Sequence, residues 1–189
     1  MGKHSQLASR NSHLVIRDFQ ADDQPAAREL ILDGLREHWG EDFAPGRNPD
    51  LDDIAASYGE GVCLVALLGD SLVGTGMLIP ERGGAVKGGG VPAGERVARI
   101  LRMSVASVLR RQGIGSRLLE SLCTRARENG YRKIVLETTS TWEDAKAFYR
   151  EAGFKVLGER DGDTHFEREV QGLGEQGNRK TVTPGILIY

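Results

Sequence analysis

The chain has 189 residues, a formal net charge of −2 and 28% charged residues, which argues against nonspecific binding to nucleic acid. Its hydrophobic fraction of 39% is that of a globular protein with a single core. No apolar run reaches the ~20 residues of a membrane span, and the N-terminus lacks the apolar core of a signal peptide. We therefore expect a cytoplasmic protein without a membrane or nucleic-acid partner.

Three regions divide the sequence. Residues 1–12 are polar and aperiodic, which predicts a disordered leader, and residues 13–170 form the predicted domain. Residues 171–189 form a polar tail that ends on the apolar segment Gly185–Tyr189. That segment is a candidate edge strand, either within this domain or between the subunits of a homodimer.

Apolar periodicity predicts the elements of the domain. Strands are predicted at 13–19, 62–68, 72–79, 97–105, 133–138, 155–159 and 164–170. Helices are predicted from an N-cap at Asp22 and Asp23 to about Leu35, from Asp50 to Tyr58, from Ile114 to near Asn129, and from Thr141 to just before Gly153. Asp144, three residues after Thr141, approximates a capping box. The order predicts an α/β (α+β) fold, a mixed sheet with helices on both faces.

The remaining segments are predicted loops. Residues 39–49 hold two prolines and two glycines, and Gly83–Gly94 has six glycines in twelve residues. The two cysteines, Cys63 and Cys123, lie in apolar stretches, which is typical of buried free thiols rather than of a disulfide or a metal site.

Charge is distributed unevenly along the sequence. Ten basic residues and two acids lie between Arg96 and Lys133, whereas six acids and one arginine lie between Glu37 and Asp53. Each run has a simple interpretation as a solvated face. The alternative is a basic pole for an anionic cofactor and an acidic pole for a cationic substrate.

The segment Arg110-x-x-Gly113-x-Gly115 joins the predicted strand 97–105 to the helix that begins at Ile114. The first amides of a helix lack intrahelical acceptors, and together with the helix dipole they attract anions. The two glycines would let a phosphate approach the backbone, while Arg110 and Arg111 supply positive charge. A simple strand-to-helix turn is the alternative for this motif considered alone.

A second motif, Ala145-x-x-Phe148-Tyr149-x-x-x-Gly153-Phe154, lies downstream of the first. The two motifs, at this separation and with this order of elements from His13 to Val170, resemble those of the GNAT superfamily of acyl-CoA-dependent N-acyltransferases. The resemblance implies a GNAT fold, in which two splayed strands of the mixed sheet form the acyl-CoA site. It also implies an enzyme that transfers acetyl from acetyl-CoA to a primary amine of a small molecule or a protein, by direct attack in a ternary complex.

The resemblance assigns residues to the cosubstrate acetyl-CoA. The pyrophosphate would lie on the amides from Arg111 to Ser116, and the pantetheine would pair with the strand end from Met103 to Val105 as an added strand does. The Val105 amide would polarise the acetyl carbonyl and stabilise the oxyanion. The expected cofactor-binding residues are Met103, Ser104, Val105, Arg110, Arg111, Gln112, Gly113, Ile114, Gly115, Ser116, Trp142, Ala145 and Phe148.

The resemblance also implies a catalytic residue. Tyr149 would be the general acid that protonates the departing thiolate of coenzyme A. Its alternative is a core aromatic of an amphipathic helix, like Phe148. No metal is expected.

Two positions depart from the family pattern. Trp142 replaces an asparagine that contacts the cofactor in many members, and its indole could instead pack on pantetheine. Arg99 replaces the glutamate that acts as general base in the histone-acetylating branch. Glu137, near the end of the neighbouring strand, is the local candidate for the general base. Its alternative roles are a strand-end salt bridge or a contact with pantetheine. Many family members deprotonate the amine through water instead.

These departures keep other functions open. A noncatalytic acyl-CoA sensor or interaction domain is the main rival, motivated by Trp142 and Arg99. A nucleic-acid module built on the basic run is the weakest, since no nucleic-acid motif is present.

Overall fold

The computed structural model describes residues 14–81 and 96–170. The predicted leader, the Gly83–Gly94 loop and the tail with its Gly185–Tyr189 segment lie outside these residues. Within them, one mixed sheet has the strand order β1-β2-β3-β4-β5-β7-β6. Neighbouring strands are antiparallel except β4 and β5, which are parallel. The predicted fold class, a mixed sheet flanked by helices, is confirmed.

The element bounds follow the predictions closely for the strands. They are β1 (Leu14–Asp18), β2 (Val62–Leu68), β3 (Ser71–Pro80), β4 (Val97–Val105), β5 (Lys133–Thr139), β6 (Lys155–Arg160) and β7 (Asp163–Glu169). The α-helices are α2 (Gln24–Trp39), α3 (Ile54–Tyr58), α4 (Ile114–Glu128) and α5 (Glu143–Glu151). Short 3₁₀ turns lie at Ala21–Asp23, Gly40–Asp42, Pro45–Arg47, Pro49–Leu51 and Ser107–Leu109.

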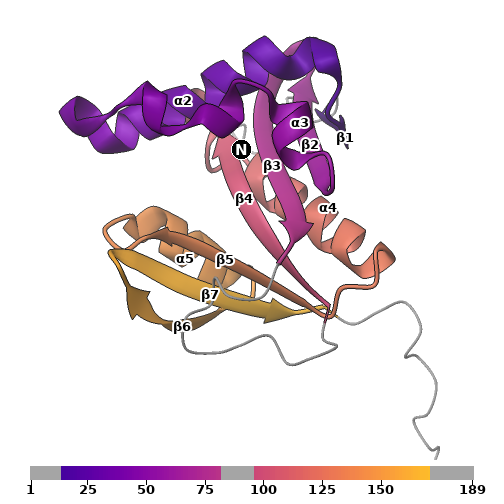
Figure 1. The fold of residues 1–189 in the computed structure, drawn as a ribbon, viewed down its shortest axis with the longest axis vertical. Helices are drawn as coiled ribbons and strands as arrows, with labels where there is room; N and C mark the ends of the chain where they lie inside the picture. Colours follow the sequence, from indigo (N-terminus) through magenta and orange to yellow (C-terminus); the bar gives the residue numbers. More distant parts are fainter. Residues whose placement is uncertain (1–13, 82–95, 171–189) are drawn as a thin grey trace, which may run out of the picture.

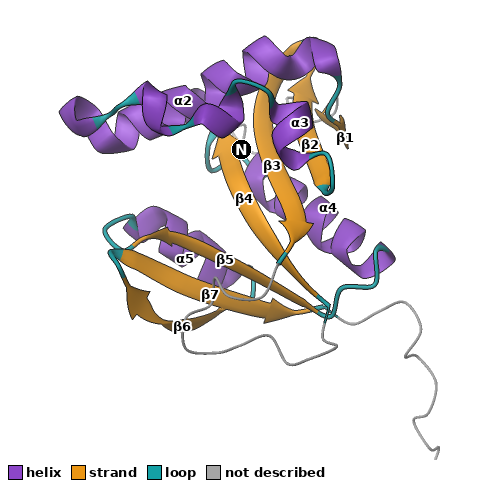
Figure 2. Ribbon diagram, viewed as in Figure 1, coloured by secondary structure: helices purple, strands orange, loops and turns teal. Residues whose placement is uncertain are grey.

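Helices cover both faces of the sheet, because each helix buries one apolar stripe. On one face, α4 and α5 pack on the strands through a core that includes Leu118, Leu122, Tyr149 and Phe166. On the other face, α2 and α3 cover the strands from β2 to β4 through a second core. Figure 2 shows that this second layer does not extend over β5, β7 and β6, whose opposite face carries α5.

Two helix predictions need correction. The α2 helix continues to Trp39, and the predicted loop 39–49 holds 3₁₀ turns, two of which begin at Pro45 and Pro49. The predicted helix from Asp50 starts only at Ile54, because the side chain of Asp53 caps it by accepting from the Ala56 amide at 2.9 Å.

The predicted capping box at Thr141 is also wrong. The N-cap of α5 is Trp142, and no side chain caps it. A turn in which the Trp142 amide donates to the Thr139 carbonyl at 2.9 Å delays the start of the helix, and Asp144 accepts from Arg111 instead.

Both thiols are free, as predicted, and we expect them to react slowly in the native protein. Burial raises the pKa of Cys63 to about 11 and also raises the pKa of Cys123. A thiol pKa raised by two units lowers the thiolate fraction near pH 8 on the order of 10²-fold. A disulfide reagent should therefore label the thiols of the native protein slowly. In guanidinium, where the protein is unfolded, it should label both thiols at once. Rapid labelling of either thiol in the native protein would contradict this, and Cys63→Ser should leave one slow thiol.

Candidate active site

The central strands separate partway along their length. Strands β4 and β5 pair only where Val97–Arg99 faces Lys133–Val135, whereas β3 stays paired with β4 up to Val105. Beyond Arg99, the sheet therefore opens into two wings, β1 to β4 and β5 to β6, which diverge in Figure 1. The wedge between them leaves one edge of β4 without a strand partner.

A bulge in β4 accompanies the opening. The register with β3 shifts between Thr75 and Met77, and Arg102 lies in the left-handed region with φ of 52°. The Thr75 hydroxyl donates to the Arg102 carbonyl at 3.0 Å and so holds the bulge closed on the β3 side. Bulges redirect a strand and increase its twist, which fits the divergence of β4 from β5.

The end of β4 directs a backbone amide into the wedge. The Ala106 amide donates to Val73 of β3 at 3.0 Å. Because successive residues of an antiparallel pair alternate in direction, the amide and carbonyl of Val105 point away from β3. The Val105 carbonyl accepts from Arg110 Nε at 3.0 Å, which is consistent with that direction.

The loop after β4 leads into α4 at Ile114, as predicted, and has two residues in the left-handed region. Arg111 and Gly113 both have positive φ, at 61° and 83°, and Gly113 is the N-cap of α4. The first amides of α4, from Ile114 to Ser116, have no acceptor within the helix by its geometry.

The two arginines of the loop have acidic partners. Arg110 binds Glu37 of α2 at 2.8 Å, and the exposed guanidinium of Arg111 binds Asp144 of α5 at 2.9 Å. Exposed pairs of this kind contribute little stability, so an anion could displace the carboxylates at small cost.

The loop, the strand end and α5 meet at Gly115. A Cβ atom placed on Gly115 would lie 3.6 Å from the Phe148 ring and 3.7 Å from Val105. The structure thus brings the two sequence motifs together across 33 residues of chain, as the resemblance implies.

The Tyr149 side chain is 8% exposed and lies in the core formed with α4. Its ring is 5.8 Å from that of Phe166 on β7 and 5.9 Å from that of Phe154. Burial raises the pKa of its hydroxyl well above the ordinary value. No described residue forms a hydrogen bond with this hydroxyl, although buried phenols normally have a partner.

Glu137, whose side chain is 37% exposed, pairs with the buried Arg99 near the point where β4 and β5 separate. Arg99 Nη1 is 2.6 Å from Glu137 Oε2, and Arg99 Nε is 2.6 Å from Glu81 Oε2. Burial disfavours the guanidinium charge, but the hydrogen bonds from both carboxylates outweigh it and raise the Arg99 pKa. The salt bridge considered as the alternative for Glu137 is therefore present.

Much of the acidic run contacts arginines. Glu37 binds Arg110, Asp52 binds Arg28, and Asp50 binds Arg102 through both carboxylate oxygens, at 2.7 and 2.9 Å. The two runs of opposite charge thus neutralise each other in part. This outcome weakens the argument from charge runs for a cationic substrate.

Trp142 contacts the end of α2. Its ring stacks on that of His38 at 4.0 Å between centroids and meets Trp39 edge-on at 6.0 Å. These contacts join the two wings of the sheet, because α2 covers one and α5 covers the other. Sequence periodicity gave no indication of them.

The sequence patterns did not indicate two further sets of interacting side chains. Arg102, held by Asp50, also donates to Asn48 at 3.0 Å and lies beside Tyr58, whose hydroxyl donates to Asp50. Burial and the bond to Asp50 raise the pKa of Tyr58 to about 12. The other is His165 on β7, the cross-strand partner of Glu137. For the group around Arg102, the available sequence signal was an unusual arginine at the position of the bulge.

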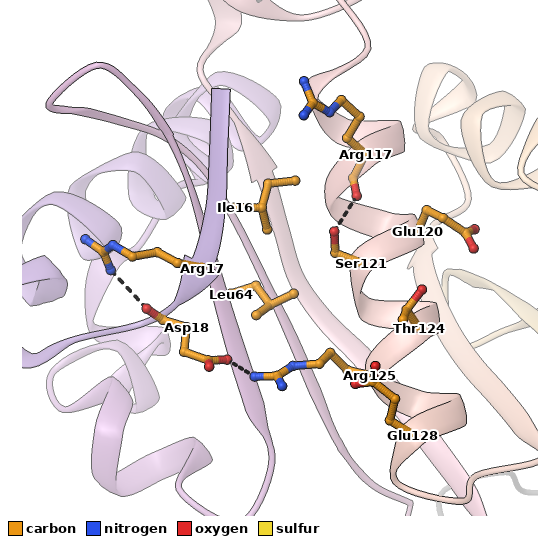
Figure 3. A pocket seen from close by; sticks show the side chains of 10 residues that line it. All are labelled: Ile16, Arg17, Asp18, Leu64, Arg117, Glu120, Ser121, Thr124, Arg125 and Glu128. Atoms are coloured by element: carbon orange, nitrogen blue, oxygen red, sulfur yellow. Dashed lines mark hydrogen bonds and ion pairs between the residues drawn. The ribbon is translucent and has the colours of Figure 1, made fainter. Parts of the chain in front are cut away.

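A groove along the described residues lies elsewhere, between β1, β2 and the outer side of α4 (Figure 3). It measures about 640 Å³ and has an apolar floor of Ile16 and Leu64 with a charged rim. None of the predicted site residues lines it. In the described part of the chain, no group of acidic, His or Cys side chains could hold a metal, and no helix is long and apolar enough to cross a membrane.

Proteins of known family are similar to this chain in sequence. The family model "Acetyltransferase (GNAT) family" matches residues 29–154. N-acetyltransferase 8F1 of Rattus norvegicus is 32% identical over 124 residues, which are 65% of this chain and 53% of that protein. N-acetyltransferase 8 of Rattus norvegicus is 33% identical over 58% of this chain and 48% of that protein. The chain thus spans about half the length of the curated relatives it matches.

Solved structures share the fold. A GNAT-family acetyltransferase from Staphylococcus aureus Mu50 has a TM-score of 0.69 at 20% identity, covering 84% of this chain and 99% of that one. The PaiA N-acetyltransferase of Thermoplasma acidophilum, solved in complex with coenzyme A, has a TM-score of 0.68 at 16% identity, covering 82% and 98%. The family match covers well over half of the sequence and includes both motifs. The chain belongs to the GNAT family of acetyltransferases.

Proposed function

We propose that the protein transfers acetyl from acetyl-CoA to a primary amine in a ternary complex. One observation carries the proposal: beyond Arg99 an edge of β4 has no strand partner among the described residues, and at Gly115 the start of α4 meets both Val105 at the end of that edge and Phe148, the neighbour of Tyr149 on α5. An extended pantetheine chain suits an open strand edge, because backbone amides and carbonyls there can pair with its amide groups.

The loop would hold the pyrophosphate. The amides from Arg111 to Ser116, with Gln112 and Gly113 among them, would donate to it at the positive end of the α4 dipole. Arg110 and Arg111 would exchange their carboxylate partners Glu37 and Asp144 for phosphate oxygens.

The reacting thioester would lie along the end of β4. Met103, Ser104 and Val105 would flank it, with the Val105 amide as the oxyanion donor. Ala145 and Phe148 of α5 would pack on the opposite side of the pantetheine, with Trp142 at the end of the helix. The amine attacks the carbonyl carbon, the C–S bond breaks, and Tyr149 gives its proton to the sulfur. Because its pKa is raised, Tyr149 stays in the protonated form that this step requires.

The acceptor would approach from the α2 and α3 side of the sheet. At the base of the wedge, two carboxylates, Glu81 and Glu137, surround one guanidinium, Arg99. The remaining negative charge favours a cationic amine, of a small molecule or a protein.

Thiol release separates the enzyme from an acyl-CoA sensor. Acetyl-CoA would be incubated with spermidine, phenethylamine, phenylalanine and Nα-acetyl-lysine, and free coenzyme A would be measured. An enzyme releases thiol with at least one amine, well above hydrolysis. Tight binding of acetyl-CoA without any amine-dependent release would favour the sensor.

Arg111→Gln should raise the KM for acetyl-CoA about 5-fold and leave kcat nearly unchanged, because a phosphate contact contributes to binding before and during the reaction alike. Arg111 is exposed, and among the described residues its ion-pair partner is Asp144, itself exposed, so its loss should not alter folding. Arg150→Gln, a change of charge elsewhere on the surface, is the matched control. An unchanged KM would remove Arg111 from the phosphate site.

A further inference from the structure

We infer that His165 is the group that accepts the proton from the acceptor amine, with Glu137 orienting its ring. The inference rests on the proposed acetyl transfer. It supplies a general base, a role that Arg99, at the position of the family's glutamate, cannot fill. The observation that supports this inference is the juxtaposition of His165 and Glu137 on the face of the sheet opposite Tyr149. His165 Nδ1 lies 3.5 Å from Glu137 Oε2.

The two strands place these residues opposite the general acid. Glu137 and His165 are cross-strand partners on β5 and β7, as are their neighbours Leu136 and Phe166. Leu136 and Phe166 face the core of α4 and α5, where Phe166 meets the Tyr149 ring. Because side chains alternate along a strand, Glu137 and His165 face the other way. Acid and base thus lie at one level of the sheet, on its two faces.

This arrangement suits a reaction with two partners. The thiolate forms beside Tyr149, and the amine must approach the carbonyl from a different side. A proton acceptor for the amine is therefore needed on the face where α2 and α3 lie, and His165 is on that face.

Glu137 itself is a poor candidate for the base. The oxygen nearest His165, Oε2, also receives the Arg99 guanidinium at 2.6 Å. That guanidinium is 9% exposed and is held in turn by Glu81, which is 3% exposed. That oxygen is thus already engaged with a cation, so Glu137 is placed to hold the His165 ring rather than to receive the proton of the amine. Its negative charge instead favours the His165 tautomer with a proton on Nδ1.

The other ring nitrogen of His165 is then the acceptor. No described residue forms a hydrogen bond with Nε2, and the side chain is 15% exposed. Glu137 is the charged group in contact with the ring, and it binds Arg99, which binds Glu81. On the same face of β7, Asp163 lies two residues before His165, with Arg160 of β6 opposite it. Glu167, on the same face of β7, is engaged with Lys133 at 3.2 Å, and β6 contributes the uncharged Gly158 opposite His165.

The step balances in protons and electron pairs. The amine lone pair forms the N–C bond, and His165 Nε2 takes the proton that the nitrogen loses. The C–S bond then breaks with its electron pair on sulfur, which takes the proton of Tyr149. Water carries the proton from the imidazolium to the phenolate, and the products are the amide and coenzyme A.

The test uses the full chain, acetyl-CoA and the same four amines, with thiol release followed from pH 6 to 9.5. For His165→Ala we expect kcat at pH 7 to fall about 10²-fold, with the KM for acetyl-CoA unchanged. The rate of the variant should rise with pH across the range where the wild type levels off. Added imidazole should restore part of the rate. Glu167→Gln, on the same strand and face, should match the wild type.

The possible results distinguish a failure of this inference from a failure of the proposed function. An active wild type with a His165→Ala variant of equal kcat and equal pH profile would overturn the inference and leave the proposed function standing. A wild type that binds acetyl-CoA and acetylates none of the amines would overturn both. If His165→Ala does not fold, His165→Gln replaces it in the same assay. Nitrogen-15 NMR of the imidazole should also find Nδ1 protonated in the wild type and that preference lost in Glu137→Gln; an Nε2-protonated ring would contradict the inference.

Discussion

Tyr149→Phe should lower kcat about 10²-fold while acetyl-CoA binds as before, because the change removes only the proton that the thiolate would receive. The ring stays, so its contacts with Phe154 and Phe166 in the core are kept. Since burial raises the Tyr149 pKa above its ordinary value, the wild-type phenol stays protonated at alkaline pH, and we expect no loss of kcat from its ionisation up to about pH 10.

The matched control for this variant is Tyr131→Phe. Tyr131 is a partly buried tyrosine at the edge of the same core, and its ring lies under the Arg96 guanidinium. Its hydroxyl has no place in the proposed reaction. Steady-state kinetics and acetyl-CoA titration on both variants make the comparison, and a Tyr149→Phe variant with full turnover would remove Tyr149 from the mechanism and leave it a core aromatic.

Arg99→Met should lower the free energy of unfolding by about 3 kcal/mol at pH 8, because it leaves a buried carboxylate without its cation. The carboxylate of Glu81 is 3% exposed, so water cannot replace the guanidinium. Urea denaturation would measure the loss.

Two controls isolate the buried charge. The double variant Arg99→Met with Glu81→Gln should recover much of the lost stability, since no charge is then left unpaired. Arg125→Met, which breaks an exposed pair with Asp18, should cost less than about 1 kcal/mol. A double variant no more stable than Arg99→Met alone would show that lost packing, rather than the stranded carboxylate, causes the deficit.

The sequence predicts the local parts of the fold and site well. Strand β4, the loop from Arg110 to Gly113 and helix α4 each depend on neighbouring residues, on period and on glycines with positive φ. The motif around Tyr149 is local as well, so its place on a helix was predictable. Element bounds failed where tertiary contacts decide them, as for α2, whose end at His38 and Trp39 packs on Trp142.

Pairs that depend on strand register were not predictable. Glu137 and His165 are 28 residues apart and become neighbours only because β7 pairs with β5 instead of with β4. Arg102 and Asp50 are 52 residues apart and meet at the bulge of β4, and the arginine in that strand did not identify Asp50 as its partner. A charge run indicates that charges lie close in sequence, but not which opposite charges neutralise them, so the acidic run suggested an open pole where the structure has several ion pairs.

Transfer of a labelled acetyl group to an amine would demonstrate the proposed reaction itself. The protein would be incubated with acetyl-CoA carrying carbon-13 in the carbonyl and with the most active amine of the panel, and the carbonyl resonance would be followed by NMR. We expect the thioester signal to decay as an amide signal grows in equal amount, with one free thiol released per amide. A label that stays on coenzyme A, or that appears as free acetate with no amide, would contradict it.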